Sequence, residues 1–369
     1  MSINNASPGV TERLETLRER LESTKLDGLV ITSPENRRFL SGFTATDPML
    51  TESSGALFIA PGRQCLLTDS RYSLIASIEA PDFEIVETDG SGLGKSLAGL
   101  VKPGDLLGFE PNYLTFAVYL SLSERSGLKL EPCPFDPSEL RLAKSLDEVR
   151  DITRALEITE TAMGWLFDRL QPGWTEAEAA WFMDSTFREL GAQGPAFETI
   201  VASGPQAALP HAVPGEKKIA EGEMVVIDCG ARYKGYASDI TRTFVCGEPE
   251  KWQRDIYRIV REAQLMAIEA IAPGVPCRDV DKVAREHIEA AGHARHFGHG
   301  LGHGVGLAVH EAPNLNPRNE KPLVEGAIVT VEPGIYLPGQ GGVRLEQLVL
   351  VTDKGAKVLN KNNNFYDFR

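Results

Sequence analysis

The amino-acid sequence predicts an α/β domain followed by an α+β domain with an internal two-fold repeat. Three observations lead to this prediction. Helical patterns alternate with short apolar runs early in the chain, a cluster of prolines interrupts them, and beyond it the same order of helix pair and strand-rich stretch occurs twice. The chain has 369 residues, of which 42% are hydrophobic. This is enough for two domains with separate cores.

The first domain is expected to span residues 1–144. Its apolar runs at residues 28–31, 56–59 and 64–67 are short enough for strands, and the segments between them have helical periodicity. Strands that alternate with helices are typical of an α/β unit.

The second domain is expected to span residues 145–369. Ser145 and Glu148 have the spacing of a capping box, which marks the start of a helix. Three prolines crowd the preceding stretch and indicate a linker, at Pro132, Pro134 and Pro137.

Two segments of the second domain are alike. Residues 221–230 and 325–334 each run from Glu-Gly through an apolar strand into a carboxylate and a glycine, and the carboxylates are Asp228 and Glu332. Pro-Gly connections, helix-ending glycines and two His-x-x-Pro segments also recur at nearly the same spacing. The alternative is a chance repeat of common connections. We favour an internal duplication, which would place a site between two half-domains.

A β-hairpin that turns at Lys234 and Gly235 is predicted in the first half. If the turn contains two residues, strand alternation places Asp228 and Asp239 on one face as diagonal neighbours, roughly 7 Å apart at the backbone. A divalent cation would neutralise these two carboxylates. The alternative is a solvated sheet face on which Asp239 pairs with Arg242.

Two further acids follow in the second half. Glu332 ends an apolar strand, and Glu346 lies in a strand pattern beyond a glycine-rich connection. Duplicated geometry would bring both to the two aspartates. Alternation points Arg344 and Glu346 the same way and Gln347 the opposite way.

Histidines are concentrated in the same half. Glycine alternates through residues 298–306, which excludes a stable helix and predicts extended backbone close to something bulky. His299 and His303 then share a face. One imidazole beside four carboxylates fits two ions of the manganese, cobalt or iron type better than a structural zinc. Four of the seven histidines lie in or near this run, at His296, His299, His303 and His310.

These motifs resemble the pita-bread metallopeptidases, which include aminopeptidase P, prolidase and methionine aminopeptidase. The resemblance rests on the hairpin at 228–243, the glycine–histidine run, and the segments 331–334 (Val-Glu-Pro-Gly) and 343–346 (Val-Arg-Leu-Glu). Residues 33–43 and 67–72 look like the creatinase/prolidase N-terminal domain, which disfavours methionine aminopeptidase. The resemblance covers nearly the whole chain. It implies a creatinase-type α/β domain followed by an α+β pita-bread catalytic domain with two-fold pseudo-symmetry.

Carried over by position, the resemblance implies five ligands for two divalent metal ions. Asp239 and Glu346 would bridge the ions, Asp228 would complete one, and His303 with Glu332 would complete the other. Manganese is the expected metal, with cobalt and iron as alternatives and zinc less favoured. Two such ions activate a water and polarise the scissile carbonyl, and Glu332 is the implied proton shuttle.

Other residues are implied to contact the substrate. His211, His299 and His310 match the family's non-ligand histidines, which donate to the carbonyl and the oxyanion; the alternative is a polar core triplet. Arg344 is a candidate clamp for a substrate carboxylate, and an ion pair with a neighbouring acid is equally plausible. The family usually has aspartate where this chain has Gln347. We hypothesise that this exchange tunes metal affinity.

The resemblance implies an aminopeptidase P-like enzyme, which hydrolyses the Xaa-Pro bond at the N-terminus of a peptide with proline in second position. The alternative is a prolidase, which acts on free Xaa-Pro dipeptides. A metal-free creatinase-like enzyme or a non-catalytic binding module would have lost the five ligands, and all five are present. A homodimer is expected from the resemblance alone.

Composition narrows the partners and the compartment. A net charge of -14 and a pI near 5.1 argue against nucleic acid and anionic membranes as partners. The sequence has neither a secretory signal pattern nor a membrane-spanning apolar run, and its five cysteines lack a Cys-x-x-Cys pair. A cytoplasmic location is therefore expected. Residues 360–364 are expected to be loose.

Overall fold

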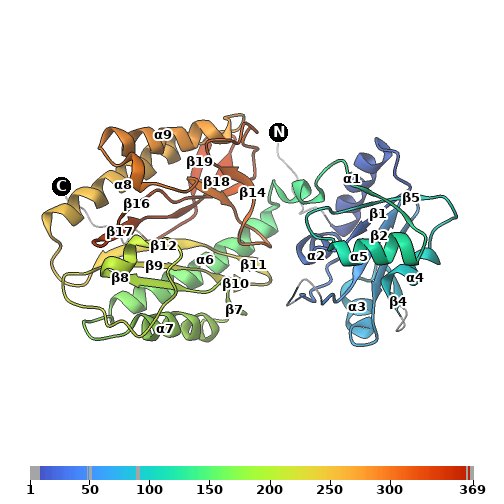
Figure 1. Cartoon of the computed structure of the whole chain (residues 1–369), viewed down its shortest axis with the longest axis horizontal. Coiled ribbons are helices and arrows are strands. Elements are labelled where there is room, and N and C mark those ends of the chain that lie inside the picture. Colours follow the sequence, from blue (N-terminus) through green and yellow to red (C-terminus); the bar gives the residue numbers. More distant parts are fainter. Residues whose placement is uncertain (1–8, 48, 50–51, 89–91, 363–364, 366–369) are drawn as a thin grey trace. The chain divides into compact units, whose positions relative to one another are not determined.

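The computed structural model describes residues 9–47, 49, 52–88, 92–362 and 365 (Figure 1). The chain divides into two compact units, Met1–Arg141 and Leu142–Arg369. This division lies near the boundary expected after residue 144.

The first unit has the α/β architecture that its alternating pattern predicts. Its six strands form one mixed sheet in the order β4-β3-β2-β1-β5-β6. The strands are β1 (Gly28–Ile31), β2 (Ala56–Ala60), β3 (Arg63–Thr68), β4 (Glu84–Glu87), β5 (Leu106–Phe109) and β6 (Lys129–Pro132). The α-helices are α1 (Val10–Glu22), α2 (Pro34–Ser41), α3 (Ser73–Glu79), α4 (Leu93–Ala98) and α5 (Phe116–Leu120), with shorter helical turns at η1 (Ser121–Arg125) and η2 (Pro137–Arg141).

Apolar side chains from the central strands form the core of this unit. Val30, Phe58, Leu67 and Leu107 are all buried in one cluster. They come from β1, β2, β3 and β5, so the short apolar runs of the sequence are the strands that pack together.

The second unit consists of two helix pairs with strands between them. Figure 1 shows α6 and α7 on one side of these strands and α8 and α9 on the other. Ser145 and Glu148 form the predicted capping box at the start of α6. The helices are α6 (Leu146–Phe167), α7 (Glu176–Glu189), α8 (Lys251–Glu269) and α9 (Cys277–Ala290), with short turns at η3 (Gly204–Ala208) and η4 (Ala294–His296).

Matching glycines give the two halves the same backbone path. Gly173 and Gly274 have φ of 99° and 85°, and Gly191 and Gly292, after α7 and α9, have φ of 91° and 87°. Glycine adopts this left-handed conformation without steric strain, so it ends both helices at the same place. The internal two-fold repeat predicted from the sequence is confirmed.

The strands of the second unit form two principal sheets, in the orders β12-β9-β8 and β14-β13-β15-β18-β19. Smaller sheets have the orders β11-β10-β7 and β16-β17. The first half contributes β7 (Gly194–Pro195), β8 (Ile200–Ser203), β9 (Met224–Cys229), β10 (Ala231–Tyr233), β11 (Tyr236–Ala237) and β12 (Ile240–Val245). The second contributes β13 (Gly302–Gly304), β14 (Glu311–Leu315), β15 (Ile328–Val331), β16 (Gly334–Leu337), β17 (Gly341–Arg344), β18 (Gln347–Thr352) and β19 (Gly355–Val358).

The predicted hairpin of the first half is present with the predicted register. Lys234 and Gly235 form its two-residue turn, with φ of 46° and 81°. Two positive φ values are the signature of a type I′ turn, which suits the twist of a hairpin. Asp228 pairs with Thr241 across β9 and β12, so Asp228 and Asp239 are diagonal neighbours as predicted.

The C-terminal segment differs from the expectation of a loose end. Asn360 accepts a hydrogen bond from the Leu348 amide at 2.7 Å, and the amides of Lys361 and Asn362 donate to the buried Glu160 carboxylate. Tertiary contacts that a local polar pattern does not reveal hold residues 360–362 in place. Residues 363 and 364 lie outside the described part.

Within the described residues, no helix is both long enough and apolar enough to cross a membrane.

Candidate functional site

One cavity of about 410 Å³ in the second unit brings the predicted site residues together. The acids lie at strand ends: Asp228 in β9, Asp239 before β12, Glu332 after β15 and Glu346 between β17 and β18. All nine side chains singled out from the sequence line this cavity: His211, Asp228, Asp239, His299, His303, His310, Glu332, Arg344 and Glu346.

The acids and His303 form two groups that share Glu346. One group is Asp228, Asp239 and Glu346, and the other is His303, Glu332 and Glu346; within each, potential ligand atoms lie within 4.8 Å of one another. Asp228 Oδ1 and Glu346 Oε1 are buried, and neither has a hydrogen-bond partner among the described residues. Buried carboxylate oxygens without donors are costly unless a cation binds them. The residues therefore fit a pair of divalent ions.

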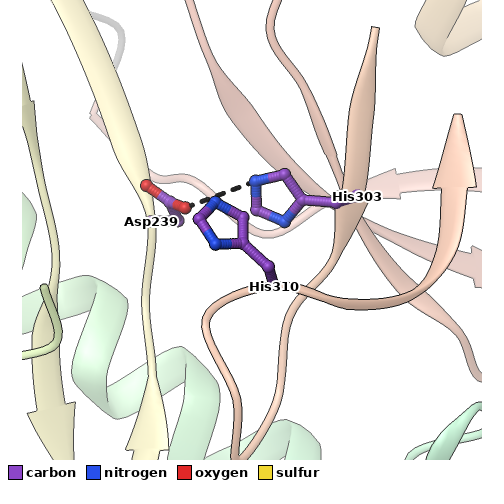
Figure 2. A group of neighbouring side chains, drawn as sticks. All are labelled: Asp239, His303 and His310. Atoms are coloured by element: carbon purple, nitrogen blue, oxygen red, sulfur yellow. Dashed lines mark ion pairs between the residues drawn. The ribbon is translucent and has the colours of Figure 1, made fainter. Parts of the chain in front are cut away.

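Figure 2 shows how the two halves meet. Asp239 projects from the first half toward His303 and His310 of the second. His303 Nε2 lies 3.6 Å from Asp239 Oδ2, and the two imidazole rings meet edge to face with centroids 4.3 Å apart. These three side chains form a third potential ligand group. The geometry thus also places His310, expected as a non-ligand, within reach of an ion.

The proton of neutral His303 is on Nδ1, because Nδ1 faces the Gly304 carbonyl at 3.1 Å and a carbonyl only accepts. Nε2 then carries the lone pair, and it lies 3.2 Å from Glu332 Oε1. Burial by itself would lower the pKa of His303, but the hydrogen bond and charge of Glu332 and the charge of Glu346 raise this pKa to about 9. Without metal, a proton takes the place of the cation.

The bridging candidates are strongly perturbed acids. Burial, and then the charges of Glu346, Asp228 and Glu332, raise the pKa of Asp239 well above its usual range. Burial, and then the charges of Glu332 and Asp228, raise the pKa of Glu346 well above its usual range. Burial also opposes ionisation of Glu332, but its hydrogen bond with His303 lowers its pKa to about 2. Such repulsion among acids is what a bound cation relieves.

Arg344 is buried beside the cavity and is held by protein groups. Its Nη2 pairs with Asp228 Oδ2 at 2.6 Å, Nε donates to the Thr241 hydroxyl at 3.1 Å, and Nη1 donates to the Pro210 carbonyl and the Tyr336 hydroxyl. Of the two roles considered for Arg344, the structure contains the ion pair with an acid.

Both ring nitrogens of His299 are engaged as well. Nδ1 faces the Gly300 carbonyl at 2.7 Å and must donate, so Nε2 accepts from the Tyr336 hydroxyl at 2.8 Å. Burial lowers the pKa of His299 and keeps the ring neutral. His299 lines the cavity but has no free ring donor for a substrate, whereas exposed His211 and His310 are not constrained in this way.

Two threonines and a tyrosine complete the site and were missed in the sequence. Thr241 donates to Glu346 Oε2 at 2.8 Å, and Thr330 donates to Glu332 Oε1 at 3.0 Å. Strand alternation could have found Thr241, which lies two positions after Asp239. Tyr336 has no comparable signal, because its partners are distant in sequence.

The glycine run has the close packing that its pattern predicts. A Cβ at Gly302 would overlap the Thr330 carbonyl, and one at Gly304 would overlap the Ala312 carbonyl. Only glycine lets these strands approach so closely. The close approach carries His303 to the acids.

Gln347 and Arg242 differ in how well they match the orientations expected for them. Gln347 does not line the cavity and receives a hydrogen bond from Arg261 at 3.4 Å, so it faces away from the acids as predicted. Arg242 does not pair with Asp239; it donates to the carbonyls of Thr241 and Glu346. The solvated-face alternative is therefore wrong, and Asp239 is only 4% exposed.

Comparison with known proteins now identifies the family. Residues 150–353 match metallopeptidase family M24, and residues 13–143 match the creatinase/prolidase N-terminal domain. An Xaa-Pro dipeptidase from Pyrococcus furiosus is 38% identical over 352 residues, covering 95% of this chain and 98% of that protein.

Solved structures agree along nearly the whole chain. An Xaa-Pro dipeptidase from Bacillus anthracis has a TM-score of 0.90 at 39% identity, covering 96% of this chain and 98% of that one. An X-Pro aminopeptidase from Thermotoga maritima MSB8 has a TM-score of 0.83 at 35% identity, covering 95% and 98%. The pita-bread fold with a creatinase-type N-terminal domain is confirmed. With its acid and histidine groups in place at the cavity, the chain belongs to metallopeptidase family M24 and is a hydrolase.

Proposed function

We propose that this protein is a dinuclear-metal aminopeptidase that hydrolyses the Xaa-Pro bond at the N-terminus of peptides. The observation that carries the proposal is the pair of ligand groups that share Glu346, with two buried carboxylate oxygens that have no hydrogen-bond partner in the described part of the chain. A cavity beside these groups has room for a short peptide end.

The cavity wall suits proline next to the scissile bond. Phe197, Ile200 and Val309 are apolar side chains that line it together with the charged residues. A pyrrolidine ring would bury its methylene groups there, which stabilises the complex by about 0.8 kcal/mol for each buried CH₂. The polar cluster then faces the carbonyl and the leaving nitrogen.

The metal assignment follows the five expected ligands. Asp239 and Glu346 would bridge, Asp228 would complete one site, and His303 with Glu332 would complete the other. Two bound divalent ions would supply Lewis-acid activation of water and of the peptide carbonyl. Manganese is the proposed metal, with cobalt and iron as alternatives, because the donor set is rich in carboxylates.

The protein's own groups would handle the protons and the developing charge. Glu332 Oε1 lies beside His303 and Thr330, and its carboxylate would accept a proton from water and pass it to the proline nitrogen. His310 and His211 line the cavity and would donate to the carbonyl oxygen. Burial, followed by the charge of His303, lowers the pKa of His310, so its ring is neutral near pH 7. In this proposal His299 orients its neighbours and does not donate to the substrate.

Prolidase activity on free Xaa-Pro dipeptides is the second candidate. The named Xaa-Pro dipeptidases from Pyrococcus furiosus and Bacillus anthracis favour it, since both align over nearly the whole chain. A prolidase needs a positive group for the proline carboxylate. Arg344 already donates to Asp228, which argues against this arginine as the clamp for a substrate carboxylate and favours aminopeptidase activity.

Release of alanine from Ala-Pro-Ala and from Ala-Pro by the manganese-loaded enzyme tests the proposal, with EDTA-treated enzyme as control. Cleavage of the tripeptide is expected. Cleavage of the dipeptide alone would make the protein a prolidase. Cleavage of neither peptide, by protein that binds manganese, would refute the Xaa-Pro assignment.

A homodimer and a cytoplasmic location are part of the proposal. All five cysteines are free and buried, which supports a reducing compartment. Light scattering on the purified protein would test the dimer.

A further inference from the structure

A connected set of polar side chains, with one aromatic ring, supports the backbone behind the acid cluster. It consists of Arg242, Arg261, Gln264 and Phe365, which we call the arginine brace. Arg242 is 1% exposed and Gln264 is fully buried. None of the four lines the cavity. Their contacts nevertheless reach the backbone on which the acids are carried.

Arg242 connects the segments that carry the two bridging acids. Its Nη1 donates to the carbonyl oxygens of Thr241 at 3.0 Å and of Glu346 at 2.5 Å. Thr241 lies two residues after Asp239 on the same strand pattern. One guanidinium group therefore joins the first half to the second beside both bridging carboxylates.

Arg261 and Gln264 make a matching connection within the second half. Arg261 Nη1 donates to Gln264 Oε1 at 2.5 Å and to Gln347 Oε1 at 3.4 Å. Gln264 Nε2 then donates to the carbonyls of the residues directly before Glu332 and Glu346, at 3.0 and 2.7 Å. The position of one amide group thus affects two acids of the cluster.

Phe365 holds both guanidinium groups. The Arg242 and Arg261 Cζ atoms lie 4.3 and 3.7 Å from the centroid of its ring. Among the described residues, neither arginine forms an ion pair with a carboxylate. Both guanidinium groups therefore lie against one aromatic ring, and an electron-rich ring face attracts a cation.

The C-terminal segment delivers the ring to this position. Asn362, three residues before Phe365, donates its amide to Glu160 and accepts from Arg242 Nη2 at 3.3 Å. Phe365 also packs against the main core cluster of the unit. The ring therefore contacts both the two arginines and the core cluster.

We propose that Phe365 is a positioning residue for the metal centre. Its ring lies against Arg242, which bonds the Glu346 carbonyl, and against Arg261, which bonds the Gln264 side chain that holds the carbonyls directly before Glu332 and Glu346. Loss of the ring then weakens divalent-metal binding without removing a ligand. The inference rests on the proposed metal site and is independent of which peptide is cleaved. Groups that orient metal ligands typically change metal affinity by about 10- to 100-fold. Phe365 acts through the arginines, so we expect an effect of about 10-fold.

The test measures Mn²⁺ affinity by isothermal titration of EDTA-stripped full-length protein. Phe365→Leu removes the aromatic face and is expected to weaken Mn²⁺ binding about 10-fold, while Phe365→Tyr keeps the ring and the parent affinity. Phe135→Leu is the matched control, because the Phe135 ring also lies against an arginine, in the first unit. The Cζ atom of Arg20 is 5.9 Å from the centroid of that ring. This control should bind Mn²⁺ as the parent does.

A second background separates the brace from simple packing. Gln347→Asp would give Arg261 a carboxylate partner, so Arg261 would depend less on the ring. In that background, Phe365→Leu is expected to cost at most about threefold in Mn²⁺ affinity, which is a coupling energy of about 0.7 kcal/mol or more. An equal cost in both backgrounds would show that the ring acts by packing alone and would overturn the proposal.

Two further outcomes are decisive. Mn²⁺ affinity of Phe365→Leu within about twofold of the parent would refute a positioning role. If that variant does not fold, Arg261→Lys replaces it, because lysine keeps the charge but lacks the planar fork that reaches Gln264 and Gln347. Parent-like affinity in Arg261→Lys would also overturn the proposal. Failure of Xaa-Pro hydrolysis with normal Mn²⁺ binding would refute the proposed function alone.

Discussion

The two halves of the catalytic unit share a backbone plan and supply different chemistry. Each half has a helix pair, and α7 and α9 are both 14 residues long. The first half contributes Asp228, Asp239 and His211 to the site. The second contributes His303, Glu332 and Glu346, together with His299 and His310. A repeated fold therefore fixes where side chains converge without fixing which side chains they are.

The difference arises at the extended run between α9 and β15. Glycines at 302 and 304 let β13 lie against neighbouring carbonyls, and His303 between them reaches the acids. In the first half, the paired strands β9 and β12 carry the acids directly. In the second half, close backbone packing brings the His303 imidazole to the acids, whereas in the first half the strand register places the two aspartates.

Removing one of the proposed bridging acids from each half tests whether the halves contribute equally, and we expect these substitutions to lower activity more than any other. Asp239→Asn and Glu346→Gln each remove a negative charge from the centre, so we expect kcat/KM to fall by at least about 10³-fold in both. Metal content by mass spectrometry should fall with it. Asp184→Asn, which alters a first-half acid bonded to Thr199, is the control. Full activity in either bridging variant would contradict the two-metal proposal.

Substitution of two histidines of the second half is expected to have a smaller effect on activity. His303→Ala should lose metal, because Nε2 is the imidazole nitrogen that faces Glu332. His310→Ala should keep metal and lose about 10²-fold in kcat, as expected for a proton or hydrogen-bond donor. If the His310 variant instead fails to bind metal, His310 is itself a ligand, as its grouping with Asp239 and His303 allows.

Metal removal should make stability depend on pH through acids from both halves. The pKa values of Asp239 and Glu346 are raised by burial and by neighbouring carboxylates, and that of His303 is raised to about 9 despite burial. Through these three groups the folded metal-free protein binds more protons than the unfolded chain, so they make its free energy of unfolding fall as pH rises. Glu332, whose pKa is lowered to about 2, acts in the opposite sense at lower pH, and so do His299 and His310 below about pH 6.5, because burial lowers their pKa values.

Thermal unfolding of EDTA-treated and manganese-loaded protein across about pH 7 to 9, above the range in which His299 and His310 titrate, measures this effect. We expect Tm of the EDTA-treated protein to fall as pH rises, and the increase in Tm caused by manganese to grow as pH rises. An equal Tm shift at every pH would mean that these groups do not titrate in that range.

The smallest expected effect concerns the helix starts, where the two halves differ. Thr175 caps α7 in a capping box, whereas its counterpart α9 begins after Pro276 without a side-chain cap. Thr175→Ala should lower the free energy of unfolding by about 1 kcal/mol, measured in urea, with little change in activity. Thr161→Ala, an exposed change inside α6, serves as the control. Equal losses in both variants would indicate that the cap adds nothing.

Patterns that depend on neighbours in the chain were predictable. Period-two alternation and a Lys-Gly turn placed Asp228 and Asp239 as diagonal neighbours, and the register confirms it. Alternating glycines predicted extended, closely packed backbone around His303. The resemblance in these motifs gave the family, which the comparisons confirm.

Roles that depend on a partner far along the chain were not predictable in the same way. Arg344 had two candidate roles until the fold put it on Asp228, and the fold engages both nitrogens of His299 through Tyr336 and the Gly300 carbonyl. The register of the hairpin could be read from the amino-acid order, because it follows from local periodicity and turn geometry, and the resemblance of the motifs indicated the residues that gather at the cavity. The hydrogen-bond partners of Arg344 and His299, and the contact of Phe365 with two arginines, became known from the fold alone, because packing joins segments that are distant in the chain.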